Sequence, residues 1–214
     1  MRLELAERLR CPNDHAPTPL VVVAREKRDR ELLGGFAGCP VCRLEARIEA
    51  GHVCFPAILH EDMAESSSIV GPWWSAELER TIALLGLAEP GGAVLLTGRY
   101  AALAQGITAT VDTAVVVMGA AEIPVASDLV AGVTGSLSVV PFTDGTFRAA
   151  AVDAWSPPGF IADAARTVVA RGRVLVPASH PPPPGLKELA RDEREWVAER
   201  SAVGAVVELK RSGR

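Results

Sequence analysis

The chain of 214 residues carries 26 acidic and 22 basic side chains, so its net charge of −4 gives no overall field that attracts nucleic acid. Polar residues interrupt its longest apolar stretch, which is therefore too short to span a membrane. The N-terminal sequence MRLELAERLR is charged throughout, unlike a signal peptide. These features predict a cytoplasmic protein, in which clustered cysteines indicate metal ligands or thiols before disulfides.

Two short motifs near the N-terminus predict a metal site. Cys11 and His15 form a C-x3-H motif, and Cys39 and Cys42 form a C-x2-C motif. Two such turns packed together supply the closed tetrahedral Cys3His set that suits structural zinc. The alternative is that reduced cysteines fill a small core. Zinc is favoured because a segment this small needs a staple to fold.

The residues around these motifs predict a small β-rich segment. We expect a short helix over Arg2–Leu9, and a strand over Leu20–Glu26 that returns over Asp29–Leu33 after which Gly34 and Gly35 turn the chain. Cys54 lies in an apolar run and is interpreted as a buried thiol. His52 and His60 are interpreted as surface or loop residues.

The segments LRCPNDH and GFAGCPVCRLEARIEAGHVCF resemble the zinc-ribbon protein that activates tRNA and release-factor methyltransferases. They also resemble ribbons fused to the front of some bacterial methyltransferases. The resemblance implies a zinc-ribbon domain over residues 1–60 that binds a protein partner, or RNA, and carries no reaction itself.

The rest of the chain predicts a doubly wound α/β domain over residues 73–214, behind a polar linker at 61–72. Val-rich runs between Gly and Pro turns are typical of strands buried on both faces of a parallel sheet, with helices covering those faces. In chain order, the predicted elements are a helix at Trp73–Leu87, strands at Ala93–Thr97 and Thr113–Met118, a third strand-like piece at Ser138–Phe147 leading into the fourth strand, a helix at Phe160–Gly172, a strand at Arg173–Pro177, a helix at Leu186–Arg200 and a last strand at Val203–Leu209.

This second part resembles the class I S-adenosylmethionine-dependent methyltransferases. The passage Pro141-Phe142-Thr143-Asp144-Gly145-Thr146-Phe147 is similar to the family's "LPFxDGxFD" segment before the fourth strand, and is mainly structural. The resemblance implies that Gly98, Glu122 and Ser156 line a cofactor site for S-adenosylmethionine. The plainer interpretations are a solvated turn carboxylate at Glu122 and a proline-stiffened loop at Ser156.

Several residues depart from the family pattern. The turn after the first strand has a single glycine followed by Arg99 and Tyr100, where small residues normally let the backbone approach the cofactor. The second strand ends at Met118 without the expected acidic residue, and Arg148 replaces the family's acidic residue after the motif phenylalanine.

Two functions follow from these observations. The first is a zinc-ribbon protein with a degenerate methyltransferase-like domain, a pseudoenzyme that serves as a binding or scaffold subunit. The second is a divergent, active methyltransferase acting on RNA or protein. A Rossmann domain for another nucleotide is weaker, because the chain has no G-x-G-x-x-G motif. The sequence names neither a substrate, a partner nor an oligomeric state.

Overall fold

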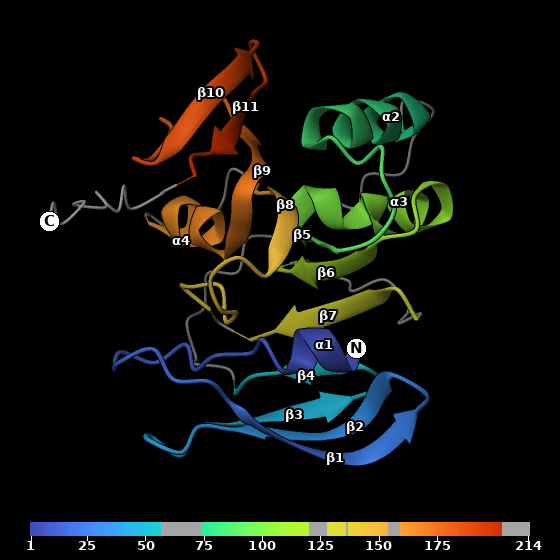
Figure 1. Cartoon of the computed structure of the whole chain (residues 1–214), viewed down its shortest axis with the longest axis vertical. Coiled ribbons are helices and arrows are strands. Elements are labelled where there is room, and N and C mark those ends of the chain that lie inside the picture. Colours follow the sequence, from blue (N-terminus) through green and yellow to red (C-terminus); the bar gives the residue numbers. More distant parts are fainter. Residues whose placement is uncertain (57–73, 120–127, 136, 154–158, 203–214) are drawn as a thin grey trace, which may run out of the picture.

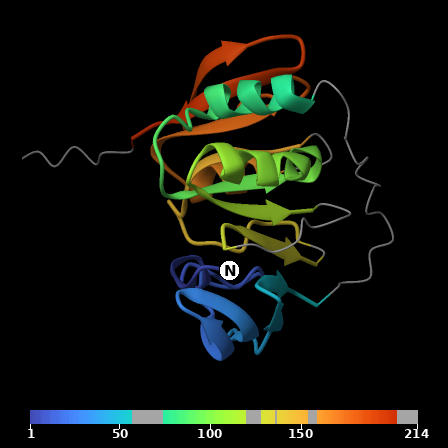
Figure 2. The same cartoon turned by 90° about the vertical axis from the view of Figure 1, so that its right-hand side faces the viewer.

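The computed structural model describes residues 1–56, 74–119, 128–135, 137–153 and 159–202. In these residues one sheet of 11 strands runs through the molecule in the order β1-β2-β3-β4-β7-β6-β5-β8-β9-β11-β10. Figures 1 and 2 show that the N-terminal strands form one end of this sheet and the last hairpin the other.

The centre of the sheet is parallel and doubly wound. The chain steps outward from β5 to β6 and β7, then returns to the other side of β5 to form β8 and β9. Every residue of β5 and β6 is buried, as expected for apolar strands covered on both faces. The predicted α/β fold class is thus confirmed. The parallel strands are β5 (Ala93–Thr97), β6 (Ala114–Met118), β7 (Val130–Thr134), β8 (Phe147–Ala151) and β9 (Val168–Pro177).

Helices cover both faces of this sheet and give it two cores (Figure 1). On one face, α2 and α3 pack over the first core, and a short 3-10 helix, η1, joins β5 to α3. On the other face, α1 and α4 belong to a second core that also takes in the N-terminal strands. The helices are α1 (Leu3–Ala6), α2 (Trp74–Leu85), η1 (Gly98–Leu103), α3 (Ala104–Thr110) and α4 (Phe160–Thr167).

The N-terminal strands continue the parallel sheet. They form an antiparallel meander whose last strand, β4, pairs in parallel with β7 through Val53 and Cys54. We call residues 1–56 the ribbon. The division into domains at 1–60 and 73–214 stays a prediction. The ribbon strands are β1 (Val21–Arg28), β2 (Glu31–Gly38), β3 (Glu45–Glu49) and β4 (His52–Cys54).

The predicted turn at Gly34 and Gly35 is wrong. Both glycines lie inside β2, and the hairpin turns at Asp29, whose φ is 51°. Gly35 is needed for strand pairing, since a Cβ there would lie 2.2 Å from the carbonyl oxygen of Val23. The first helix is also shorter than predicted, covering Leu3–Ala6 only.

The predicted helix at Leu186–Arg200 is wrong: this segment is a hairpin of β10 (Leu186–Arg191) and β11 (Glu195–Arg200). Asp192 sets the turn, because its side chain accepts the backbone N–H groups of Arg194 and Glu195, both at 2.8 Å. Such local bonds compete with a helix. Antiparallel pairing of β11 with β9 then buries Trp196 fully.

Two further boundaries differ from the prediction. The third strand is β7, which the sequence reading missed, and residues 138–146 form an irregular connection into β8. The helix predicted to reach Gly172 ends at Thr167, where β9 begins. Gly172 lies in β9 against the backbone of β8, where a Cβ would be 2.4 Å from the carbonyl oxygen of Arg148.

His52 joins the ribbon to the parallel sheet. Its Nδ1 accepts the backbone N–H of Gly132 in β7 at 2.7 Å, so the residue is a structural acceptor and is only partly exposed. Burial, and the nearby N-terminal amino group, lower the pKa of His52 below its ordinary value of 6.5. Protonation at Nδ1 would remove this bond.

The junction at His52 is therefore expected to weaken in acid. Because the folded-state pKa is lowered, its stabilising contribution is complete above the unfolded pKa and is lost as pH falls toward the folded pKa. Urea unfolding at about pH 7 and about pH 5 should show a larger loss for wild type than for His52→Asn, by no more than about 1 kcal/mol at this half-exposed site. Equal losses in the two proteins would contradict this role.

None of the helices in the described ranges is long and apolar enough to cross a membrane. The predicted linker at 61–72 and the predicted last strand at Val203–Leu209 lie outside the described residues.

Candidate functional site

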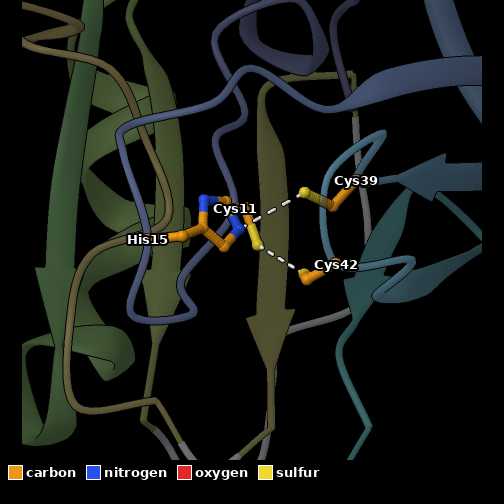
Figure 3. A group of neighbouring side chains, drawn as sticks. All are labelled: Cys11, His15, Cys39 and Cys42. Atoms are coloured by element: carbon orange, nitrogen blue, oxygen red, sulfur yellow. Dashed lines mark hydrogen bonds between the residues drawn. The ribbon is translucent and has the colours of Figure 1, made fainter.

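The four predicted metal ligands converge on one point between two loops of the ribbon (Figure 3). The ligand atoms of Cys11, His15, Cys39 and Cys42 all lie within 4.8 Å of one another. Two of the separations are 3.5 Å: Cys11 Sγ to Cys42 Sγ, and Cys39 Sγ to His15 Nε2. Tetrahedral zinc, with bonds of about 2.0–2.3 Å, places its ligand atoms roughly 3.5–3.8 Å apart. The cluster can therefore hold a metal ion.

Neighbouring groups prepare these side chains as ligands. His15 Nδ1 lies 2.8 Å from the Ala16 carbonyl oxygen, and donating its proton there directs the Nε2 lone pair toward the three sulfurs. The backbone N–H of Leu44 is the main cause that lowers the pKa of Cys42 to about 6, which favours the thiolate. Burial instead raises the pKa of Cys11 to about 12. A bound cation would oppose that effect.

The Cys/His cluster is anchored to the parallel sheet through the residue before Cys11. The Arg10 backbone N–H donates to the Pro141 carbonyl oxygen at 3.0 Å. Its guanidinium donates to Asp163 on α4 at 3.1 Å, and Asp163 also accepts the Val140 N–H at 2.6 Å. Asp163 thus bonds both to the loop that carries Cys11 and to the connection that enters β8.

A second candidate site lies at the carboxyl edge of β5, where ligands bind in doubly wound sheets. Gly98 follows β5 directly, is buried, and adopts a left-handed φ of 52° that starts η1. The other two predicted cofactor residues, Glu122 and Ser156, lie outside the described residues.

The turn after β5 is tied into a network of polar side chains. The backbone N–H of Arg99 donates to Asp153 Oδ2 at 2.8 Å, and the Asp153 N–H donates to Thr97 Oγ1 at 2.9 Å. Arg99 Nη2 donates to Glu195 Oε1 at 2.6 Å, and the Tyr100 hydroxyl donates to the same oxygen.

Glu195 is the centre of this network. Its side chain is 1% exposed, and Arg80 of α2 donates to its second carboxylate oxygen. Burial and the Glu195 carboxylate raise the pKa of Tyr100, so the phenol keeps the proton that it donates. The two bulky residues noted in the sequence therefore lock the turn to β11.

The described residues line a small cavity beside the turn after β5. It has a volume of about 20 Å³, lies at the ends of β5, β6 and β7, and is also lined by Leu137 and Phe160. Such a volume holds roughly one water molecule. β6 ends at Met118, followed by Gly119, and both line this cavity.

The residues of the PFxDGxF passage have structural roles. Phe142 and Phe147 are fully buried, with ring centroids 5.0 Å apart in an edge-to-face arrangement. Arg148 donates to the carbonyl oxygens of Gly91 at 3.0 Å and Gly86 at 3.4 Å, so it ties down the loop that follows α2. This contact explains a basic residue at a position where the resembled family has an acidic one.

Sequence reasoning missed Asp153 and Glu195 as members of the second site. The segment containing Glu195 was predicted to be a solvated helix, and only the pairing of β11 with β9 buries this carboxylate. Asp153 comes two residues after the end of β8. Residues that bind ligands often lie at the carboxyl ends of parallel strands, so this position could have marked Asp153 as a site residue.

No family model and no curated protein sequence matches the chain. Solved structures with a similar fold include geranyl diphosphate C-methyltransferase from Streptomyces coelicolor A3(2), with 16% identity over 48% of this chain and 42% of that one, and a TM-score of 0.41. Another, from Methanococcus maripaludis, was assigned as an S-adenosyl-L-methionine-dependent methyltransferase; identity is 12% over 63% of this chain and 88% of that one, and the TM-score is 0.47. The chain spans less than half the length of the geranyl diphosphate enzyme. The fold class itself stands on the strand order and helix placement described above.

Proposed function

We propose that this protein is a zinc-ribbon protein whose methyltransferase-like domain is degenerate, and that it works as a binding or scaffold subunit. The observation that carries this proposal is the closed turn after β5. Arg99 and Tyr100 take the position of small residues, and both bond to buried Glu195.

Zinc is the metal proposed for the ribbon. Three thiolates and one imidazole form the soft, closed ligand set that suits structural zinc, and such a site leaves no open position for a substrate. When bound, zinc would be held by Cys11, His15, Cys39 and Cys42 and would fix the two loops together. The ribbon would then present its outer surface to a protein partner, in a reducing compartment such as the cytoplasm.

The alternative is a divergent, active methyltransferase that acts on RNA or protein. Gly98 keeps a left-handed conformation at the end of the first central strand, and Asp153 stands at the end of β8. Cofactor binding would then require Glu195 to release Arg99 and Tyr100. Gly98, Glu122 and Ser156 would line that opened site.

Calorimetry with the zinc-loaded protein separates the two functions. We expect no heat of binding when S-adenosylmethionine or S-adenosylhomocysteine is added to millimolar concentration, because Arg99 and Tyr100 in the turn after β5 are bonded to Glu195. The same titration is made with a Leu137→Ala variant. This substitution enlarges the cavity at the ends of β5, β6 and β7 and leaves the hydrogen bonds around Glu195 unchanged. Micromolar binding to wild type, with methyl transfer by the protein alone, would overturn the proposal and support the enzyme.

A further inference from the structure

The ribbon exposes several large apolar side chains. Among large hydrophobic side chains there, Val41, Val21 and Val23 are the most exposed, at 63%, 58% and 56%. Val41 lies between two metal ligands, Cys39 and Cys42. Single exposed valines need no explanation, but Val21 and Val23 stand two residues apart on one face of β1 and together indicate a contact surface.

The alternation along β1 separates this face from the core. Val22 and Ala24 pack against the buried cluster that includes α1, whereas Val21 and Val23 point to the opposite side. The cross-strand partner of Val23 is Phe36, which is only half-buried and lies under the guanidinium of Arg25, 4.4 Å from its ring centroid. The outer face therefore offers an apolar strip with a cation at its end.

β1 also has a free edge. It is the first strand in the sheet order, and within the described residues no strand pairs with its second side. Proteins usually guard such edges with charges, bulges or prolines. Residues 9–11 pair with residues 18–20 directly before β1, through the Arg10–Pro19 bridge. Within β1, bulges occur only after Ala24 and charges only from Arg25 onward, so Val21–Ala24 remain open to a further strand.

The opposite edge of the sheet shows the usual protection. β10 has a bulge between Glu188 and Ala190, carries charges along its length, and exposes a single large apolar side chain, Leu189. The open character of β1 is therefore a local property of the ribbon.

Charge identifies the kind of partner. Residues 25–30 (REKRDR) are all exposed and contain four basic and two acidic side chains, in a chain whose net charge is −4. A segment lying along β1 would meet valines first and then this basic end. Acidic side chains at that place would be complementary, and would be repelled by much of the remaining surface.

We propose that the free edge of β1 binds an extended segment of a partner protein, added as a further strand, with alternating apolar residues beside Val21–Ala24 and acidic residues beside Arg25–Arg28. Main-chain hydrogen bonds supply affinity in this mode, and alternate side chains supply specificity. The inference rests on the binding role proposed for the ribbon and names the chemistry of its partner.

The test uses full-length, zinc-loaded protein and capped, fluorescein-labelled peptides. Each peptide has a valine–threonine half and a glutamate–threonine half, in both orders to allow parallel and antiparallel pairing; analogues carry lysine in place of glutamate. By fluorescence anisotropy, we expect one glutamate peptide to bind at least about tenfold more tightly than its lysine analogue. Added salt should reduce that difference.

Substitutions locate the binding to β1. Val23→Lys should weaken binding about tenfold, because it places a charge on the apolar strip without touching the core. Lys27→Glu should reverse the preference between glutamate and lysine peptides. Leu189→Lys is the matched control on the other edge strand and should change nothing. Zinc content, measured for each variant, confirms that the ribbon is intact.

Four results would overturn the inference: no binding of either glutamate peptide, equal effects of Val23→Lys and Leu189→Lys, a homodimer that Val23→Lys dissociates, or binding of a uridine oligonucleotide that Lys27→Glu abolishes while the peptides stay inert. The homodimer would show that a second copy of the chain occupies the edge of β1, and oligonucleotide binding would show that the edge binds RNA. Failure here is distinct from failure of the proposed function, since β1 and the β5 turn lie in different parts of the sheet and cofactor calorimetry reports only on the latter.

Discussion

Removal of the metal is expected to unfold the ribbon and to loosen the parallel sheet beside it. Without a cation, three sulfurs and an imidazole would face one another within 4.8 Å with nothing to neutralise the thiolates. Structural zinc contributes about 10–16 kcal/mol of apparent binding free energy in small zinc-binding peptides, more than a segment of this size gains from its own core. Chelation should therefore lower far-ultraviolet circular dichroism and the unfolding temperature together.

The extent of the effect follows from the contacts between the ribbon and the sheet. Arg10 bonds to Pro141 and Asp163, and β4 pairs with β7. Hydrogen exchange on chelation should accelerate over residues 1–55 and also near 130–143 and at the start of α4. Exchange that changes only within the ribbon would contradict this coupling.

The fourth cysteine provides the control. Cys54 lies in β4 outside the ligand cluster, so Cys54→Ser should keep stoichiometric zinc and near-native unfolding. Cys11→Ser should lose both, because Cys11 is buried and its loop has no other sulfur ligand. Zinc measured by mass spectrometry in the two variants distinguishes a metal site from a cluster of reduced cysteines. Equal zinc in both would exclude the predicted ligand set.

The convergence of Cys11, His15, Cys39 and Cys42 was predictable because these residues occur as two close pairs. A C-x3-H and a C-x2-C motif each form a local turn, so only one long-range contact had to be inferred. The same holds for β5, where a buried apolar run between glycines fixed the strand to the residue. In both places the local pattern and the overall fold agree.

The errors come from elements whose state depends on distant partners. In β11 the residues Trp196, Val197 and Ala198 are consecutive and buried, a pattern that a helix with one apolar face and a strand covered on both faces can share. Pairing with β9 decides between them. β7 was missed for a related reason. Its short sequence VAGVT is stabilised by pairing with β4 and β6, and the local sequence contains no pattern that predicts this pairing.

Glu195→Ala is expected to be among the most destabilising single substitutions in the chain. Its carboxylate accepts hydrogen bonds from Arg99, Tyr100 and Arg80. Arg99 and Tyr100 belong to η1 and Arg80 belongs to α2, so Glu195 joins two elements that are distant from β11 in the sequence. Removing one partner of a buried charge network costs about 3–5 kcal/mol, because the remaining charges and the phenol lose their partners. The guanidinium groups are 27–31% exposed and recover some hydration, so the lower part of that range is expected.

Urea unfolding measures this cost against a matched acidic residue. Glu188 pairs with Arg191 on β10 with both side chains 37% exposed, so solvent screens the pair and Glu188→Ala should cost much less than Glu195→Ala. If Glu195→Ala were no worse than Glu188→Ala, the turn after β5 would not be locked, and the strongest physical reason for a closed cofactor site would be lost. If Glu195→Ala greatly lowers the free energy of unfolding, then Arg99 and Tyr100 stabilise the fold through Glu195. Binding a cofactor at this turn would then require that these stabilising contacts be broken.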